Sequence, residues 1–157
     1  MIFGHLAISA LEHRYWDADL VPVIIAGLAP DLVDKTACQV LHLAPSGRMA
    51  GHTLAGLALS TLLIAPLWGK RAARSWALGY LGHLLGDLNS PVPWLYPFVN
   101  YDFKPSPSLW RVLHNLFRDP LSLSLEIALI VWAIVAVLCK RSAPTHLNHL
   151  EHISHQR

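Results

Sequence analysis

The chain has 157 residues, a length that fits one domain, and 54% of them are hydrophobic while only 14% are charged. Soluble domains carry about 25% charged residues, so the composition excludes an ordinary soluble protein and favours one that faces lipid. The formal net charge of +2 is too small to predict nucleic-acid binding. The two cysteines, Cys38 and Cys139, form no CxxC pair, which excludes a zinc finger.

The apolar segments predict an all-α fold, because no long stretch alternates apolar and polar residues as a half-buried strand does. In chain order, helices are expected over residues 2–16, 20–29, 52–69, 75–90, 108–117 and 121–139. The segment after Pro30 can continue as a helix, and Pro66 is expected to kink or stop the helix that contains it. We expect residues 1–141 to form one compact, membrane-embedded bundle of helices, followed by a polar, His-rich tail over 142–157.

Several of these helices are expected to cross a membrane, which makes the protein multi-pass. A crossing helix needs about 20 apolar residues, a length approached by segments 52–69, 75–90 and 121–139. The helix over 20–29 is too short to cross, and the sequence leaves open whether it enters the bilayer. Basic residues at 70–74 and 140–141 predict that these turns are cytoplasmic. His52 and Asp87 then lie together, towards the outer face.

Four histidines recur at intervals of three in the C-terminal tail, at His146, His149, His152 and His155. On a helix this spacing drifts around the axis, so the stripe is loose. An exposed polar tail explains it most simply, and a metal-scavenging tail is the sharper alternative.

The strongest chemical signal is His83-Leu-Leu-Gly-Asp87. Residues four apart lie on one face of a helix, where an imidazole and a carboxylate can bind one cation together. An ionised aspartate in such an apolar helix is costly unless it is paired, and a bound dication would offset that cost. A buried His–Asp hydrogen bond is the competing interpretation.

Three further residues are weaker candidates when each is taken alone. Asp31 follows Pro30 where an apolar helix ends, and it also suits a helix N-cap. His52 opens a long apolar helix, where an interfacial histidine is equally natural. His5 stands alone on an apolar N-terminal helix, where most histidines are satisfied by local contacts.

The chain resembles the bacterial inner-membrane metal-dependent hydrolases of the YdjM type in the order of its motifs: an early His5, Pro30-Asp31, Arg48-x-x-x-His52-Thr53, and His83-x-x-x-Asp87 before a proline-containing loop. The resemblance covers about residues 1–95. That family in turn resembles the zinc-dependent phospholipase C and single-strand nuclease superfamily. The resemblance therefore implies a helical bundle with the phospholipase C fold.

The resemblance also implies one or two divalent metal ions, most naturally zinc, held by His5, Asp31, His52, His83 and Asp87. A water activated by the metal would attack a phosphoester, with Asp31 or Asp34 accepting its proton and Arg48 holding a phosphate oxygen. A site at the depth of lipid headgroups favours a phospholipid or another amphipathic phosphate ester as the substrate. Membrane lipids are then the expected partners, and no nucleic acid is expected.

A non-catalytic membrane protein accounts for the same residues. The cluster would then serve structural metal binding, assembly or partner contact, or its carboxylates would form an ion path. The aromatic residues between positions 94 and 110 would be a docking surface or, more simply, an aromatic belt at the membrane surface. Metal stoichiometry and an open coordination position distinguish this alternative from the hydrolase.

Overall fold

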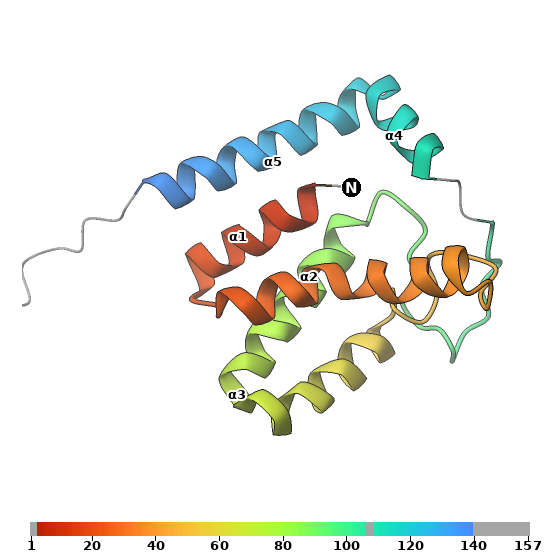
Figure 1. Ribbon diagram of the computed structural model, residues 1–157, viewed down its shortest axis with the longest axis horizontal. Coiled ribbons are helices and arrows are strands. Elements are labelled where there is room, and N and C mark those ends of the chain that lie inside the picture. Colours follow the sequence, from red (N-terminus) through yellow and green to blue (C-terminus); the bar gives the residue numbers. More distant parts are fainter. Residues whose placement is uncertain (1–2, 106–108, 140–157) are drawn as a thin grey trace, which may run out of the picture.

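The structure, a computed structural model, describes residues 3–105 and 109–139. Within these residues every regular element is a helix, as the sequence predicts. The elements are α1 (Gly4–Trp16), α2 (Leu20–Lys35), a π-helical turn (Thr36–Val40), α3 (Leu54–Gly86), α4 (Leu109–Arg118) and α5 (Pro120–Leu138) (Figure 1). The predicted His-rich tail over 142–157 lies outside the described residues.

Helix α2 is longer than the segment over 20–29 that the sequence marks out. It continues through Pro30 to Lys35 and then widens into the π-helical turn. Pro30 is fully buried, as are Ala26 one turn before it and Val23 two turns before it. Packing of this face therefore overrides the local tendency of proline to end a helix, and Asp31 lies inside the helix instead of capping a new one.

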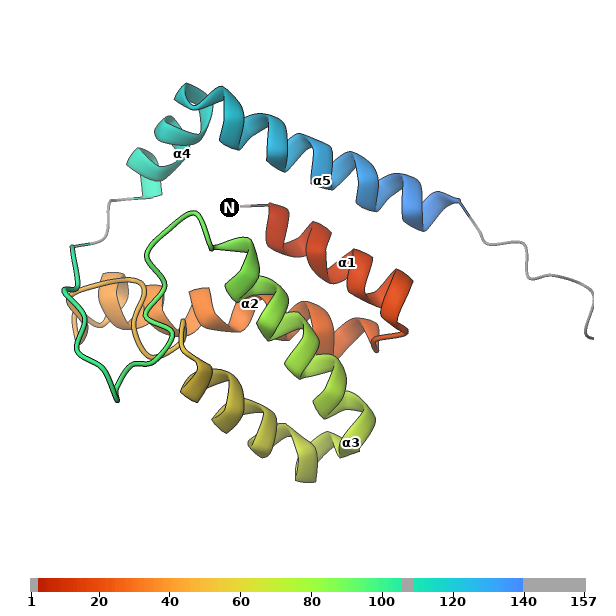
Figure 2. The ribbon, with the colours of Figure 1, turned by 180° about the vertical axis from the view of Figure 1, so that it is seen from behind.

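Helix α3 consists of two arms that meet at Gly69 (Figure 2). Gly69 has φ 82°, a conformation that glycine adopts without the steric cost of a side chain. The two arms correspond to the helices expected over 52–69 and 75–90. Pro66 lies within the first arm, so the expected break at the proline is displaced by one turn. The first arm begins at Thr53, whose side chain accepts a hydrogen bond of 2.8 Å from Gly56 N.

The main core lies between α2 and α3. Its buried members are Ala26, Trp76, Tyr80, Leu84 and Val92. The indole Nε1 of Trp76 donates a 3.0 Å hydrogen bond to Ser60 Oγ, which joins the second arm of α3 to the first. Because this core fixes the second arm against α2, it also fixes the side chains at the C-terminal end of that arm.

Helices α1 and α5 lie side by side and run in the same direction (Figures 1 and 2). Phe3 N donates a 2.9 Å hydrogen bond to the Glu126 carboxylate near one end of the pair. Arg14 Nε donates a 2.7 Å hydrogen bond to Ala136 O near the other. A second apolar cluster of small residues and leucine lies between these contacts: Ala7, Leu11, Ala133 and Ala136.

Among the described helices, only α5 is long and apolar enough to cross a membrane. Its bounds, like those of α4, agree with the sequence prediction to within a residue or two. The segments over 52–69 and 75–90 were expected to be further spans. In the structure they are the two arms of α3, which meet around the basic residues Lys70, Arg71 and Arg74. A multi-pass arrangement is therefore not supported by helix length and composition.

Candidate metal centre

Seven side chains named by the sequence analysis gather where α1, α2 and the end of α3 meet. They come from five parts of the chain: His5 from α1, Asp31 and Asp34 from α2, Arg48 and His52 from the loop before α3, His83 from α3, and Asp87 from its C-cap. Most are almost completely buried. Helix ends and one loop thus bring together residues that are as far apart as positions 5 and 87.

His83 is oriented by the backbone of α2. Its Nδ1 lies 2.7 Å from Gly27 O, and a carbonyl oxygen only accepts hydrogen bonds, so Nδ1 carries the proton. The other ring nitrogen, Nε2, then presents a lone pair to the interior of the cluster. It lies 3.2 Å from His52 Nε2 and 4.0 Å from Asp31 Oδ1.

His52 is oriented in the same way by Asp34. Its Nδ1 lies 2.8 Å from Asp34 Oδ2, so the neutral ring also turns its Nε2 lone pair inwards. This nitrogen lies 3.5 Å from Asp31 Oδ1 and 3.7 Å from Asp87 Oδ2. Two acceptor nitrogens 3.2 Å apart repel each other unless a proton or a cation lies between them. The donor set therefore fits a cation.

Asp34 is occupied by other protein groups. Its carboxylate accepts hydrogen bonds from the backbone N–H groups of Met49, Gly51 and His52, at 2.6, 2.8 and 3.2 Å, as well as from the His52 ring. Asp34 thus folds the loop onto α2 and fixes the His52 ring, the arrangement typical of a carboxylate behind a metal-binding histidine.

Asp87 and His5 form the other half of the cluster. Asp87 Oδ1 lies 3.3 Å from His5 Nε2, and Asp87 Oδ2 accepts from Arg48 Nε and Nη2 at 2.9 and 2.8 Å. The His5 ring stacks on His83 with 3.9 Å between ring centroids. Neither His5 ring nitrogen makes a hydrogen bond of acceptable geometry within the described part of the chain. Such buried, unsatisfied nitrogens fit a missing ligand.

The donor atoms form two groups that could each hold a metal ion. One group is His5, His83 and Asp87, and the other is Asp31, His52 and His83. Within each group the donor atoms lie within 4.8 Å of one another. His83 belongs to both groups, so it is the residue on which the whole cluster depends.

Contacts within the cluster favour the charged forms of Asp31, Asp34 and His52. Burial opposes ionisation of Asp34, but hydrogen bonds from His52 and from the backbone outweigh it and lower the pKa of Asp34. Burial likewise opposes ionisation of Asp31, and hydrogen bonds from His52 and Lys35 hold the pKa of Asp31 far below its ordinary range. Burial disfavours the charged form of His52, yet the two aspartates raise its pKa. Without a metal ion, the two aspartates thus favour a proton on His52.

Some contacts of the cluster were not found from the sequence. Lys35 Nζ lies 2.6 Å from Asp31 Oδ2, a pair that the four-residue spacing on α2 could have indicated. The Gly27 carbonyl that orients His83, and the Tyr80 hydroxyl that donates to Gly51 O, carry no motif. Both depend on how α2, α3 and the loop pack together.

The fold and the cluster of residues 3–105 and 109–139 define a class of protein. This part of the chain is all-helical, has a buried group of histidines and aspartates that could hold a metal, and contains one helix able to cross a membrane. Within this class, the family model described as YdjM inner membrane protein matches residues 1–147, and the chain belongs to that family. The match extends beyond the region on which the sequence resemblance rests. Comparison with curated proteins and with solved structures finds no match.

Proposed function

We propose that this protein is a membrane-bound, metal-dependent hydrolase of phosphoesters such as phospholipids or other amphipathic phosphate esters. The observation that carries the proposal is the pair of inward-facing nitrogens of His52 and His83, 3.2 Å apart and ringed by carboxylates. Two nitrogens so close together need a proton or a cation between them, and the surrounding carboxylates suit a divalent metal ion.

The proposed ligands are His5, Asp31, His52, His83 and Asp87, holding one or two ions. Mixed imidazole and carboxylate donors suit zinc, and also manganese or iron. When bound, the metal would supply an acidified water that acts as a nucleophile near neutral pH. The proposed relation to the zinc-dependent phospholipase C and nuclease superfamily rests on the order of the motifs alone.

The chain's own residues suggest how a substrate would be handled. The Asp31 side chain is 21% exposed, so it can exchange a proton with solvent, whereas Asp34 is committed to His52 and the loop. Arg48 is 34% exposed at its side chain. A guanidinium has five donors, so Arg48 can hold Asp87 and still offer donors to a phosphate oxygen.

The proposal includes a location in the inner membrane with the site near the outer face. Exposed leucines along the first arm of α3 support burial of this arm in lipid: Leu59, Leu62, Leu63 and Leu67 are 64–73% exposed. Contiguous apolar surface of this kind is unusual in a soluble monomer. Bilayer entry by both arms of α3 would make the protein multi-pass.

The test is to purify the protein in detergent with zinc or manganese present and to assay a panel of phosphomonoesters, phosphodiesters and phospholipids. We expect hydrolysis that is removed by chelation, restored by the metal and lost in His83→Ala and Asp87→Ala. His42→Ala is the matched control, because His42 is an exposed histidine outside the cluster. Unchanged hydrolysis in both cluster variants would remove the assignment.

A second candidate function, structural metal binding without catalysis, is favoured by one observation. The donors His52, His83 and Asp87 are at most 2% exposed, which is typical of a closed site. X-ray absorption spectroscopy of the metal-loaded protein distinguishes the two. A closed set of four protein ligands without water, together with no hydrolysis on the panel, would support the structural role.

A further inference from the structure

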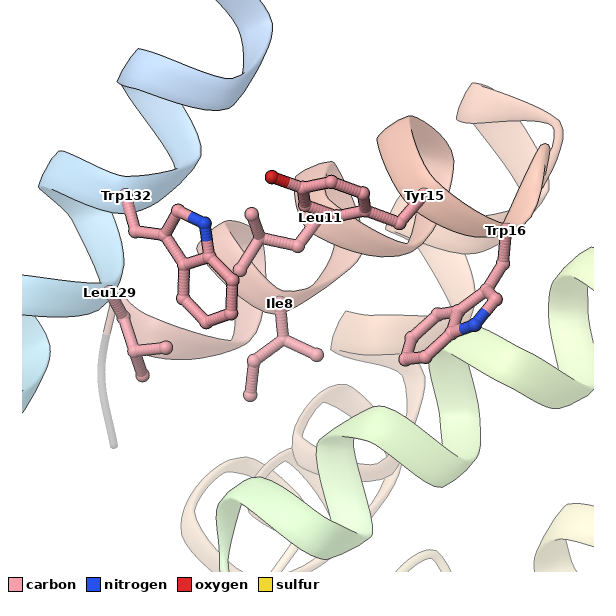
Figure 3. A pocket seen from close by; sticks show the side chains of 6 residues that line it. All are labelled: Ile8, Leu11, Tyr15, Trp16, Leu129 and Trp132. Atoms are coloured by element: carbon pink, nitrogen blue, oxygen red, sulfur yellow. The ribbon is translucent and has the colours of Figure 1, made fainter.

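A groove separate from the metal centre opens between α1 and α5 (Figure 3). Its volume is about 510 Å³, within the usual range for small-molecule sites. The side chains that line it are apolar or aromatic: Ile8, Leu11, Tyr15, Trp16, Leu129 and Trp132. We call it the α1–α5 groove.

The lining of the α1–α5 groove fits a hydrocarbon chain. It contains no charged side chain that would need a polar partner. One of its walls is α5, the described helix that can cross a membrane, so a chain lying in the groove would be continuous with the lipid around that helix. On the inner side, Ile8 packs against the α3 backbone at Gly82 and Gly86, which separates the groove from the cluster.

The end of the groove near Trp16 is basic and aromatic. Arg74 Nη2 lies 3.4 Å from Trp16 O, and Arg14 joins α1 to α5 through Ala136 O and Cys139 O. Tyr15 and Trp132 face each other across the two helices with 6.2 Å between ring centroids. Tyrosine and tryptophan concentrate at the depth of lipid headgroups.

The charges at the Trp16 end of the groove indicate which lipid headgroup would bind there. Three basic residues lie near this end, Arg14, Arg71 and Arg74. Two aspartates balance part of their charge, since Arg71 pairs with Asp17 and Asp19 at 3.4 and 3.0 Å. Arg74 is exposed and contacts only a backbone carbonyl among its described hydrogen bonds. The surplus positive charge attracts an anionic headgroup phosphate.

We propose that the α1–α5 groove binds one acyl chain of an anionic membrane phospholipid, with the headgroup phosphate at the Arg14 and Arg74 end. This lipid is distinct from the substrate of the proposed hydrolase, because its phosphate lies beyond the C-terminal end of α1, away from His5. The inference depends on the groove and its basic end, not on any metal.

The first test measures lipids retained by the purified full-length protein, using native mass spectrometry after incubation with equal amounts of phosphatidylglycerol and phosphatidylcholine. We expect one retained phosphatidylglycerol. Leu129→Trp, which fills the groove, should lower this retention about tenfold or more, a change of about 1.4 kcal/mol in binding. Ile127→Trp is the matched control, since Ile127 is 52% exposed on the same helix outside the groove. Equal retention in the two variants would overturn the proposal.

The headgroup is tested by Arg74→Gln, with the exposed Lys104→Gln as its control. We expect Arg74→Gln to reduce the preference for phosphatidylglycerol, and Lys104→Gln to leave it unchanged. A wild-type protein that retains both lipids equally, or that carries a second copy of the chain in place of lipid, would contradict the assignment.

Fluorescence quenching tests the proposal without Leu129→Trp, in case that variant fails to fold. Phosphatidylglycerol with brominated acyl chains, added to the detergent-solubilised protein at one lipid per protein, quenches tryptophan only on contact. We expect most of the quenching to disappear in the double variant Trp16→Phe/Trp132→Phe and to persist in Trp110→Phe. Quenching that the double variant retains in full would place the lipid elsewhere.

Discussion

Asp34 has contacts that its sequence position does not indicate. Sequence reasoning placed it among the proton acceptors, whereas its carboxylate accepts three backbone N–H groups and the His52 ring. No spacing rule identifies such a residue, because its partners come from a loop whose path is set by tertiary packing. The His83–Asp87 pair was identifiable because a four-residue spacing places both residues on one helical face. Asp31 was identifiable because it follows Pro30 in the order of the motifs.

Replacement of Asp34 should therefore weaken metal binding without removing a ligand. We expect Asp34→Asn to lower zinc affinity about 10–100-fold, the usual effect of losing a carboxylate behind a metal-binding histidine. Competition with a chromophoric chelator measures the affinity. Asp17→Asn, at an aspartate whose side chain is 92% exposed, is the control and should bind as tightly as the wild type. Equal affinity in both variants would show that the His52 ring needs no orienting partner.

Glu12 is a buried acid outside the metal centre. It is 3% exposed, its Oε2 has no hydrogen-bond partner among the described residues, and it lies against Gly82 of α3. Burial raises the pKa of Glu12 to about 8. Between its ordinary pKa of 4.5 and about 8, the folded chain keeps a proton that the unfolded chain loses, so this group makes stability fall as pH rises.

The prediction for Glu12 is a comparison across pH. Between pH 5 and pH 8, the melting temperature of the metal-free wild type in detergent should fall more than that of Glu12→Gln. At pH 8 the variant should be the more stable of the two, and at pH 5 the two should be similar. Parallel melting curves across the whole range would mean that Glu12 is ionised in the fold.

At the scale of elements, the second arm of α3 sets the geometry of the metal centre, because α1 and α2 both approach it closely. A Cβ at Gly79 would clash with the Val23 carbonyl of α2, and one at Gly86 would approach the His5 ring to 3.1 Å. The sequence indicates both arms by their apolar length but not the bend between them. Glycine at position 69 permits φ 82°, while Pro66, the stronger breaker by local rules, remains inside the helix.

Gly79→Ala tests this close approach. The clash is with backbone, which cannot rotate away, so we expect a loss of about 1–3 kcal/mol in the free energy of unfolding. Ala58→Leu adds more volume at an exposed position of the same helix and should cost less than about 0.5 kcal/mol. Unfolding in mixed detergent micelles measures both. A loss for Ala58→Leu as large as that for Gly79→Ala would mean that added volume anywhere on α3 is harmful.

At the scale of the whole molecule, the helical class, the bounds of α4 and α5, and the inner-membrane family could be predicted from composition, apolar length and motif order. The number of membrane spans could not. Apolar length alone does not distinguish a crossing helix from a buried core helix, and the second arm of α3 buries Trp76, Tyr80 and Leu84 against α2. Apolar residues that pack inside the protein are shielded from water without lipid, so they do not indicate a membrane span.

The central claim is that this packing brings one metal centre together around His83. Elemental analysis of the detergent-purified, metal-supplemented protein tests it directly, with His83→Ala and the exposed His42→Ala prepared in parallel. We predict one or two divalent ions per wild-type chain, the same number in His42→Ala, and none in His83→Ala, because His83 belongs to both groups of donors. A wild-type chain without stoichiometric metal, or a His83→Ala chain that keeps its metal, would contradict the account.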